Sequence, residues 1–331
     1  MKTYNVAVVG ATGLVGSTFL KVLAEYKFPI KNLTLFASER SAGKEVEYDG
    51  KLYTVKALKE GCFEGIEIAL FSAGGSVSEK WAPEAEKSGA VVIDNSSAWR
   101  MNPDCALIVP EINVNDFDTA RKIVANPNCS TIQSVLPLKP IHDKFGLKRV
   151  VYTTYQAVSG SGQKGRDDLQ RTLNGEEPKF YPYNISKTCI PHIDVFTDNG
   201  YTKEEIKMVN ETRKILHLPN LPVSATCVRV PVANAHAVSV MVELEKPFTL
   251  EEVREAFASY PGIEVMDDVK NLIYPVSTVA NGNDTVYVGR IRKDLSCENG
   301  LLFYAVSDNI RKGAAANAVQ IAKKLIEDDK I

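Results

Sequence analysis

The sequence predicts an α/β protein in which a doubly wound parallel sheet is joined to a second, α+β domain. In the first 130 residues, short and continuously apolar runs alternate with helical patterns, as is typical of strands buried on both faces of a parallel sheet. After about residue 130 the strand-like runs lengthen and apolar residues alternate with polar ones, which indicates a mixed or antiparallel sheet with helices on one face. A chain of 331 residues also exceeds what one hydrophobic core usually supports.

The first domain is predicted to contain helices over 14–26 and 76–87, and strands within 4–10, 32–38, 66–74, 90–97, 106–112 and 122–128. The last segment, 313–329, is an amphipathic helix rich in small residues. We expect it to return to the first domain, because a doubly wound sheet needs helices on both faces. The predicted boundaries are therefore 1–129 with 310–331 for this domain, and 130–309 for the second.

The second domain is predicted to contain strands within 149–160, 223–232, 236–246, 284–293 and 301–309. Helices that would cover its sheet begin near Lys164, at Thr202 and at Thr249. The last of these opens with a capping box, because Glu252 follows Thr249 by three residues.

The composition is that of an ordinary globular protein, with 44% hydrophobic residues, 24% charged residues and a net charge of −2. Neither the composition nor the net charge indicates binding to nucleic acid or to a membrane. The chain also enters its first strand without a signal-peptide pattern. The six cysteines form no CxxC pair, so we expect a reducing, cytoplasmic setting. No histidine has metal-ligand spacing with a cysteine or carboxylate, and we expect no metal.

The segment GATGLVG, with Gly10, Gly13 and Gly16, follows the first strand and opens the first helix. Backbone amides and the helix dipole make such a turn an anion site, suited to a dinucleotide pyrophosphate. At the end of the second strand, Ser38 and Arg40 stand where an acidic residue usually holds the ribose of NAD. A hydroxyl and a guanidinium suit a 2′-phosphate and favour NADP, although Glu39 between them is counter-evidence.

Cys129 lies in ANPNCSTIQ, where a strand-like run passes into a helical one. A thiol at a helix N-terminus has a lowered pKa, and the amides around it can stabilise an oxyanion. The other five cysteines lie in apolar stretches or loops without this context. Cys129 is therefore the candidate nucleophile.

Together the motifs GATGLVG, DNSSAWR, ANPNCST, TYQAVSGSG, EEIKM, ETRKI, CVRVPV, AH and SDNIRKGAA resemble, in order and over essentially the whole chain, those of aspartate-β-semialdehyde dehydrogenases. The resemblance implies a Rossmann-type domain interrupted by a catalytic and dimerisation domain. It also implies reduction of L-aspartyl-4-phosphate by NADPH to L-aspartate-4-semialdehyde and phosphate, in lysine, methionine and threonine biosynthesis, by a homodimer or homotetramer.

The resemblance gives each motif residue an expected role. Cys129 would form a thioester, Gln156 would orient the acyl group, and His236 would accept the thiol proton and later serve the thiohemiacetal hydroxyl. Arg229 would bind the α-carboxylate with its fork and Glu204 the α-amino group. The remaining substrate residues are Arg100 and Lys207, expected to hold the phosphate, and Asn128. The full cofactor set is Gly10, Ala11, Thr12, Gly13, Leu14, Val15, Gly16, Ser38, Arg40, Ser159, Gly160 and Asn309.

Four other functions remain open from the sequence. N-acetyl-γ-glutamyl-phosphate reductases share the turn, the thiol and the histidine. Their substrate has a neutral acetylated amine, which needs no carboxylate such as Glu204. Glu205 is the alternative to Glu204 as the partner of a free amine. Glyceraldehyde-phosphate dehydrogenases share the chemistry but not Ser38 and Arg40. A cysteine protease or transacylase would not need the glycine turn, and a non-catalytic NADP sensor would not need the thiol.

Overall fold

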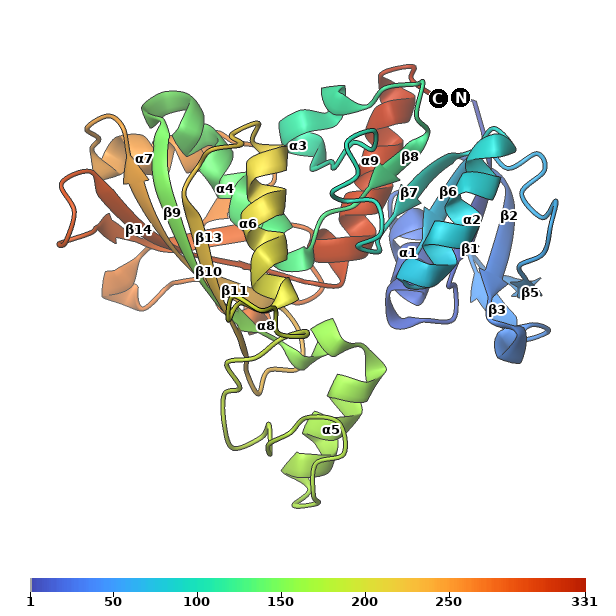
Figure 1. Cartoon of the computed structure of the whole chain (residues 1–331), viewed down its shortest axis with the longest axis horizontal. Helices are drawn as coiled ribbons and strands as arrows, with labels where there is room; N and C mark the ends of the chain where they lie inside the picture. Colours follow the sequence, from blue (N-terminus) through green and yellow to red (C-terminus); the bar gives the residue numbers. More distant parts are fainter. Residues whose placement is uncertain (1) are drawn as a thin grey trace. The chain divides into compact units, whose positions relative to one another are not determined.

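A computed structural model describes residues 2–331 and divides them into two compact units. One comprises the chain up to Asn128 together with Ala314–Ile331, and the other comprises Cys129–Gly313. Each unit has its own large sheet (Figure 1).

Within the described residues, the sheet of the first unit has six parallel strands. Val6 and Val8 of the central strand enter the core on one face, and Ala7 and Val9 enter the core on the other. This burial on both faces explains the continuously apolar runs and confirms the predicted doubly wound sheet. In spatial order the strands are β5 (Lys56–Ala57), β2 (Ile30–Ala37), β1 (Tyr4–Val9), β6 (Ile68–Phe71), β7 (Val91–Asp94) and β8 (Ile123–Ala125).

Helices cover both faces of this sheet. α1 (Leu14–Glu25) and α9 (Ala316–Glu327) contribute to one core cluster, and α2 (Gly75–Lys87) contributes to the other. The C-terminal helix thus completes the first unit, as predicted.

One predicted strand was wrong, and a hairpin was missed. In the segment 106–112 only Leu107 forms a bridge, with Ala125, and Pro110 opens the short helix α3 (Pro110–Asn113). Proline lacks an N–H for a sheet but fits the first turn of a helix. The missed hairpin joins β3 (Glu45–Tyr48) to β4 (Lys51–Thr54).

The second sheet is mixed, with β10 parallel to β9 and β12 parallel to β13, while the other neighbours are antiparallel. In its register Arg229 lies opposite Gln156, and His236 lies opposite Ser307. Candidate functional residues therefore lie at one end of four adjacent strands. The order is β10 (Val223–Arg229), β9 (Leu147–Gln156), β11 (His236–Leu244), β14 (Gly300–Ser307), β13 (Val286–Lys293) and β12 (Ile263–Val265).

The helices α4 (Cys129–Phe145), α6 (Lys203–Ile215) and α7 (Leu250–Ala258) pack against this sheet, and the short α8 (Ser277–Ala280) contacts β14. Capping boxes begin α6 and α7, at Thr202 and Thr249. The remaining short helices are η1 (Glu39–Ser41), η2 (Val114–Asp116), η3 (Val158–Ser161), η4 (Val269–Asn271) and the π-helical turn η5 (Arg311–Ala315).

The helix expected near Lys164 does not cover the sheet, which corrects the prediction. α5 (Gln163–Leu173) instead packs beside η3, and its Leu169 joins a small cluster with Ile185 and Ile190 (Figure 1). Its apolar face is too narrow for a sheet, since Leu169 is its one buried large apolar residue.

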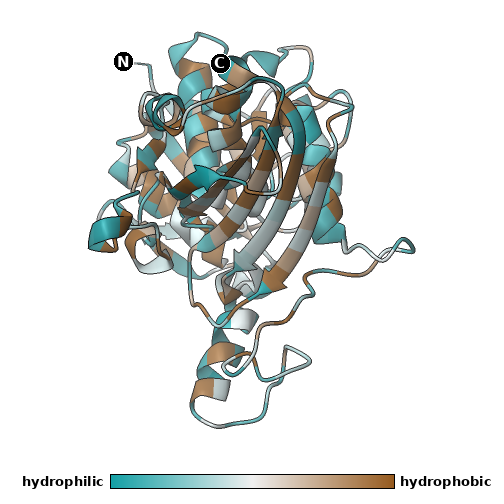
Figure 2. Cartoon of the chain, turned by 90° about the vertical axis from the view of Figure 1, so that its left-hand side faces the viewer, coloured by the Kyte–Doolittle hydropathy of each residue, from teal (hydrophilic) through white to brown (hydrophobic). Residues whose placement is uncertain are grey.

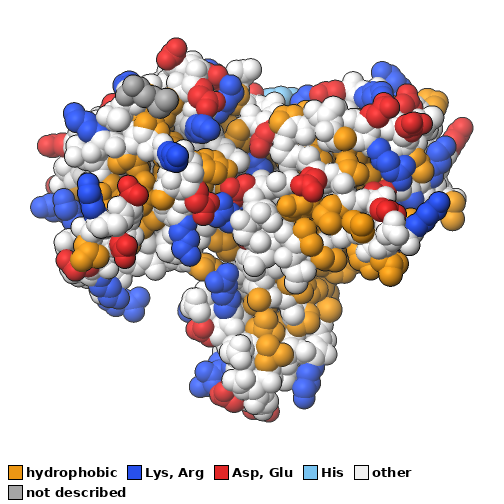
Figure 3. Space-filling view, turned by 180° about the vertical axis from the view of Figure 1, so that it is seen from behind, with side chains coloured by type: hydrophobic (Ala, Val, Ile, Leu, Met, Phe, Trp, Pro, Cys, Tyr) orange, Lys and Arg blue, Asp and Glu red, His pale blue; other side chains and the backbone are white. Residues whose placement is uncertain are grey.

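Figure 2 shows the strands of the second sheet from the side opposite its helices. On this side Tyr155 is exposed and Tyr304 is half-buried, and their rings lie 6.1 Å apart. Hydrophobic side chains also reach the surface of this unit elsewhere (Figure 3). Phe180, Tyr183 and Phe196 are among the exposed large hydrophobic residues. Across residues 2–331, no helix combines the length and apolarity needed to cross a bilayer.

Candidate active site

Cys129 is the first residue of α4, at the helix end where the dipole favours negative charge. Gly313 lies directly against it: a Cβ on this glycine would stand 2.8 Å from the Cβ of Cys129. Cys227, in contrast, is fully buried on β10, and burial, reinforced by Glu204, raises the pKa of its thiol. Of these two thiols, Cys129 has the environment of a nucleophile.

His236 begins β11 and is fully buried. Its Nδ1 accepts a hydrogen bond from the backbone N–H of Ala157 at 2.9 Å, and its Nε2 has no partner within the described residues. Burial, and then the charge of Arg229, holds the pKa of His236 well below 6.5. The imidazole is therefore neutral at physiological pH.

The hydrogen bond to Nδ1 also fixes the tautomer. A neutral imidazole carries one proton, and a nitrogen that accepts from an N–H cannot hold it, so the proton is on Nε2. In this tautomer Nε2 donates a hydrogen bond and has no lone pair to take a thiol proton. The geometry thus favours a donor role for His236 over the expected role of thiol base.

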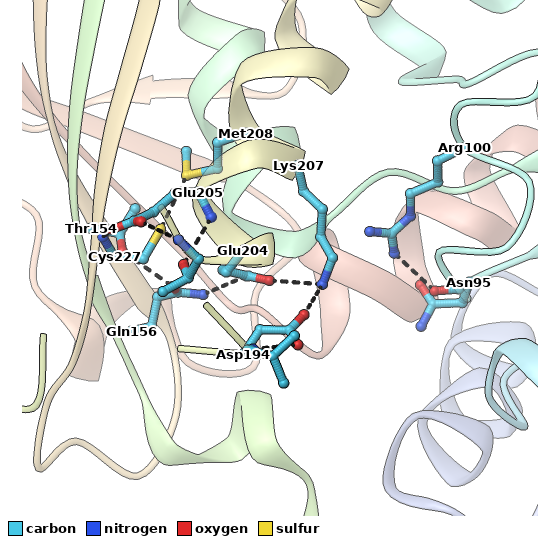
Figure 4. A network of polar contacts seen from close by, with 12 residues as sticks. Asn95, Arg100, Thr154, Gln156, Asp194, Glu204, Glu205, Lys207, Met208 and Cys227 are labelled. Carbon is cyan, nitrogen blue, oxygen red and sulfur yellow. Dashed lines mark hydrogen bonds and ion pairs between the residues drawn. The ribbon is translucent and has the colours of Figure 1, made fainter. Parts of the chain in front are cut away.

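Four side chains form a chain of polar contacts on the second unit (Figure 4). Gln156 donates from Nε2 to Glu204 at 3.1 Å, and Glu204 accepts from Lys207 Nζ at 3.2 Å. Lys207 also contacts Asp194 at 2.7 Å. Thr154 donates to the Oε1 of Gln156, which orients the amide.

The charges in this chain determine what it can bind. Burial alone would lower the pKa of Lys207, but Glu204 and Asp194 outweigh burial and the pKa is raised. Burial would raise the pKa of Asp194, but the hydrogen bond from Lys207 prevails and lowers it. In this chain of contacts two carboxylates face the one ammonium of Lys207, and Lys203 acts on Asp194 from nearby. A pair of carboxylates suits an ammonium group of a ligand. Asp194 was not predicted from the sequence.

Glu205, the alternative to Glu204, has a structural role. Its Oε2 accepts from the N–H of Thr202 in the capping box, and its Oε1 accepts from the N–H of Cys227. With both oxygens engaged by backbone, Glu205 holds α6 to β10.

Arg229 ends β10 and is 4% exposed. Its Nη1 donates to the carbonyl of Ala157 at 2.6 Å, while its Nε is buried without a partner within the described residues. No carboxylate in residues 2–331 forms an ion pair with it. A buried guanidinium lacking an anionic partner suits a ligand carboxylate.

Three predicted cofactor residues are close together in the second unit. The Oδ1 of Asn309 accepts from Ser159 Oγ at 3.1 Å and from the N–H of Ala235 at 3.0 Å, which leaves its buried Nδ2 without a partner in the described part of the chain. A Cβ on Gly160 would lie 3.1 Å from Nε2 of His236 and 2.9 Å from Nη1 of Arg229. A side chain at this position would therefore require Arg229 and His236 to shift.

Arg100 and Asn128 belong to the first unit. Arg100 is 8% exposed, and it donates from Nε to the carbonyl of Asn126 at 2.9 Å and from Nη2 to the carbonyl of Asn95 at 3.0 Å (Figure 4). These bonds give the guanidinium a fixed position. Asn128 directly precedes Cys129 in the sequence and is buried.

The glycine turn of the first unit has the form expected of a phosphate cradle. Gly10 has a φ of +89°, and a Cβ on Gly16 would lie 2.0 Å from the carbonyl oxygen of Gly10. α1 then begins at Leu14, its N-cap residue Gly13 offers no side-chain cap, and Thr12 and Gly13 are exposed. An uncapped helix start beside exposed backbone fits a pyrophosphate.

Ser38, Glu39 and Arg40 are all exposed where β2 ends. No ion pair engages Arg40 within residues 2–331, so its guanidinium is available to an anion.

Comparison with known proteins agrees with this geometry. Residues 5–120 match the family model of the semialdehyde dehydrogenase NAD binding domain, and residues 138–312 match that of its dimerisation domain. The chain is 57% identical over 335 residues to the aspartate-semialdehyde dehydrogenase of Aquifex aeolicus, covering 98% of each chain. The chain belongs to the aspartate-semialdehyde dehydrogenase family. The resemblance and the enzyme class predicted from the sequence are thereby confirmed.

Other relatives extend the family match to solved structures. The aspartate-semialdehyde dehydrogenase of Bacillus subtilis is 49% identical, with 97% of each chain covered. Aspartate semialdehyde dehydrogenase II of Vibrio cholerae, solved in complex with ASA, superposes with a TM-score of 0.95 at 47% identity over 99% of each chain. An aspartate semialdehyde dehydrogenase of Candida albicans, solved with NADP, gives a TM-score of 0.81 at 25% identity over 100% of each chain.

Proposed function

We propose that the chain reduces L-aspartyl-4-phosphate with NADPH to L-aspartate-4-semialdehyde and phosphate, through a thioester on Cys129. The observation that carries the proposal is Glu204, a buried carboxylate held by Gln156 and Lys207, with Asp194 as a second carboxylate on Lys207. Such a group selects a free α-ammonium, which an N-acetylated substrate lacks. The relatives named for the same substrate support it.

In this mechanism the sulfur of Cys129 attacks the acyl carbon, a C–S bond forms, and the C–O bond to phosphate breaks. Gln156 orients the acyl group, and Arg229 binds the α-carboxylate. NADPH, when bound, supplies the hydride that reduces the thioester carbon. The Nε2–H of His236 then stabilises the oxyanion of the thiohemiacetal, which collapses to the aldehyde and returns the thiolate.

Residues 10–16 would hold the pyrophosphate of the cofactor, Ser38 and Arg40 its 2′-phosphate, and Ser159, Gly160 and Asn309 the nicotinamide end. Arg100, Lys207 and Asn128 would contact the phosphate side of the substrate. The exposed aromatic residues of the second unit and its match to a dimerisation domain support a homodimer. The cytoplasmic setting rests on the six cysteines, which form no CxxC pair.

The test is the reverse reaction, followed as NADPH absorbance with L-aspartate-4-semialdehyde, phosphate and NADP. We expect reduction of NADP that requires phosphate and prefers the unacetylated aldehyde. The comparison reactions contain NAD in place of NADP, or N-acetylglutamate semialdehyde in place of the substrate. A preference for the acetylated aldehyde would replace the proposal with the reductase alternative.

Replacing Arg229 by lysine tests the carboxylate site. We expect Arg229→Lys to raise the KM for the semialdehyde about tenfold or more, with a smaller effect on kcat, because the charge remains while the bidentate geometry is lost. Steady-state kinetics at saturating NADP measure the effect. An unaltered KM would remove Arg229 from the substrate site.

Arg40→Ala tests the cofactor preference. Since Arg40 is exposed and makes no ion pair within the described residues, its loss should leave folding intact and raise the KM for NADP about tenfold. The KM for NAD should not change, because NAD carries no 2′-phosphate. Equal changes for both cofactors would assign Arg40 a role other than 2′-phosphate recognition.

A further inference from the structure

Gln133 lies one helical turn after Cys129 on α4 and is fully buried. Its side chain leaves its own helix and reaches two strands. Nε2 donates to the backbone carbonyl of His236 at 3.2 Å, and Oε1 accepts from the hydroxyl of Ser307 at 2.9 Å. One amide thus joins the nucleophile's helix to the first residue of β11 and the last residue of β14.

The amide has only one satisfactory orientation. A backbone carbonyl can only accept, so the side facing His236 must be the NH₂ group, and the oxygen then faces the Ser307 hydroxyl. His236 and Ser307 lie opposite each other in the sheet register, so the same amide ties both strand ends to the helix. A turned amide would leave a buried carbonyl unsatisfied.

The backbone of His236 is held by Gln133, while its ring is held by the N–H of Ala157 at Nδ1. These two contacts come from different parts of the chain, α4 and the residue that follows β9, and together they determine where Nε2 points. The contact from Ala157 fixes the tautomer. The contact from Gln133 fixes the position of β11 relative to the helix that begins at Cys129.

We propose that Gln133 is a positioning residue, which sets the separation between the sulfur of Cys129 and the Nε2–H of His236. This inference rests on the proposed function, because it assumes that these two groups act on one acyl carbon. A shift of about 1 Å between reacting groups costs up to about 100-fold in rate. The position of α4 relative to β11 must therefore be fixed closely, and the two directional hydrogen bonds of Gln133 do this.

The test is Gln133→Met, which keeps the length of the side chain and removes both hydrogen bonds. We expect kcat to fall about 10- to 100-fold, with the KM values for aldehyde and phosphate within about twofold, because Gln133 touches neither substrate. The matched control is Ser134→Ala. Ser134 is the next residue and equally buried, but its hydroxyl bonds only to the Ser130 carbonyl of the same helix, and we expect an unchanged kcat.

A double-mutant cycle separates positioning from general weakening of the fold. If Gln133 acts through His236, Gln133→Met should reduce kcat by less than about twofold in a His236→Gln background. Multiplied losses in the double variant would overturn the proposal. So would a lowered melting temperature in Gln133→Met with kcat unchanged, since that is the result of a merely structural hydrogen bond.

If Gln133→Met does not fold, Ser307→Ala carries the test. This substitution removes the hydrogen bond to Oε1 of Gln133, so that only the hydrogen bond from Nε2 to the His236 carbonyl still holds the amide. We expect kcat to fall about three- to tenfold. An unchanged kcat would overturn the proposal. The wild-type assay distinguishes failure of the proposed function from failure of the role of Gln133. An inactive wild type refutes the proposed function, whereas an active wild type with unaffected variants refutes only the role of Gln133.

Discussion

Cys129→Ser is expected to lower the turnover of L-aspartate-4-semialdehyde at least about 10³-fold while leaving the affinity for NADPH within about twofold. A serine hydroxyl at this position is a far weaker nucleophile than a thiolate at a helix start. The predicted phosphate cradle is formed by residues 10–16 of the first unit, not by the thiol. Turnover is measured by NADPH absorbance, and affinity by fluorescence titration of the cofactor.

The control for Cys129→Ser is Cys189→Ser, since Cys189 is the exposed cysteine and lies outside any helix or strand. Peptide-mapped alkylation by iodoacetamide adds an assay independent of turnover. Cys129 should react fastest, and Cys227 should stay unmodified because burial raises the pKa of its thiol. Full turnover in Cys129→Ser, or equal loss in Cys189→Ser, would contradict the nucleophile assignment.

Local patterns predicted those parts of the fold that short segments determine. The strand before Gly10 was recognisable because the sheet is buried on both faces, with Val6 in one core and Val9 in the other. The Thr249 capping box was visible as a spacing of three residues. The segment around Pro110 was misjudged because its apolar run outweighed the helix-starting preference of the proline.

The site residues that the sequence did not reveal depend on long-range contacts. Asp194 lies in a loop with a φ of +68°, and its contact with Lys207 spans 13 residues. In the sequence, nothing distinguishes Gln133 from other helix residues. Its role depends on Ser307, which is 174 residues away in the sequence and donates a hydrogen bond to it in the fold. The same reason applies to the His236 tautomer, since the N–H that fixes it belongs to Ala157.

The pKa of His236 gives the site a dependence of stability on pH. Because burial, and then Arg229, depresses this pKa in the folded state, the unfolded chain binds a proton below pH 6.5 while the folded chain does not. The contribution of the neutral His236 to the free energy of unfolding is fully present above pH 6.5. It is lost as the pH falls toward the folded-state pKa, and the free energy of unfolding then decreases by up to about 1.4 kcal/mol per pH unit. Denaturant unfolding should show this slope in the wild type and a smaller one in His236→Gln.

The same substitution distinguishes the two roles for the imidazole. If Nε2–H only donates to the oxyanion, His236→Gln should lower kcat about 10²- to 10³-fold while Cys129 is alkylated at nearly the wild-type rate. A thiol base would give the opposite pattern, because its loss would slow alkylation along with turnover. The hydrogen bond from Ala157 to Nδ1 favours the first result. Alkylation slowed in step with turnover would mean that Ala157 releases the ring during the reaction, so that the proton moves to Nδ1 and Nε2 becomes a base.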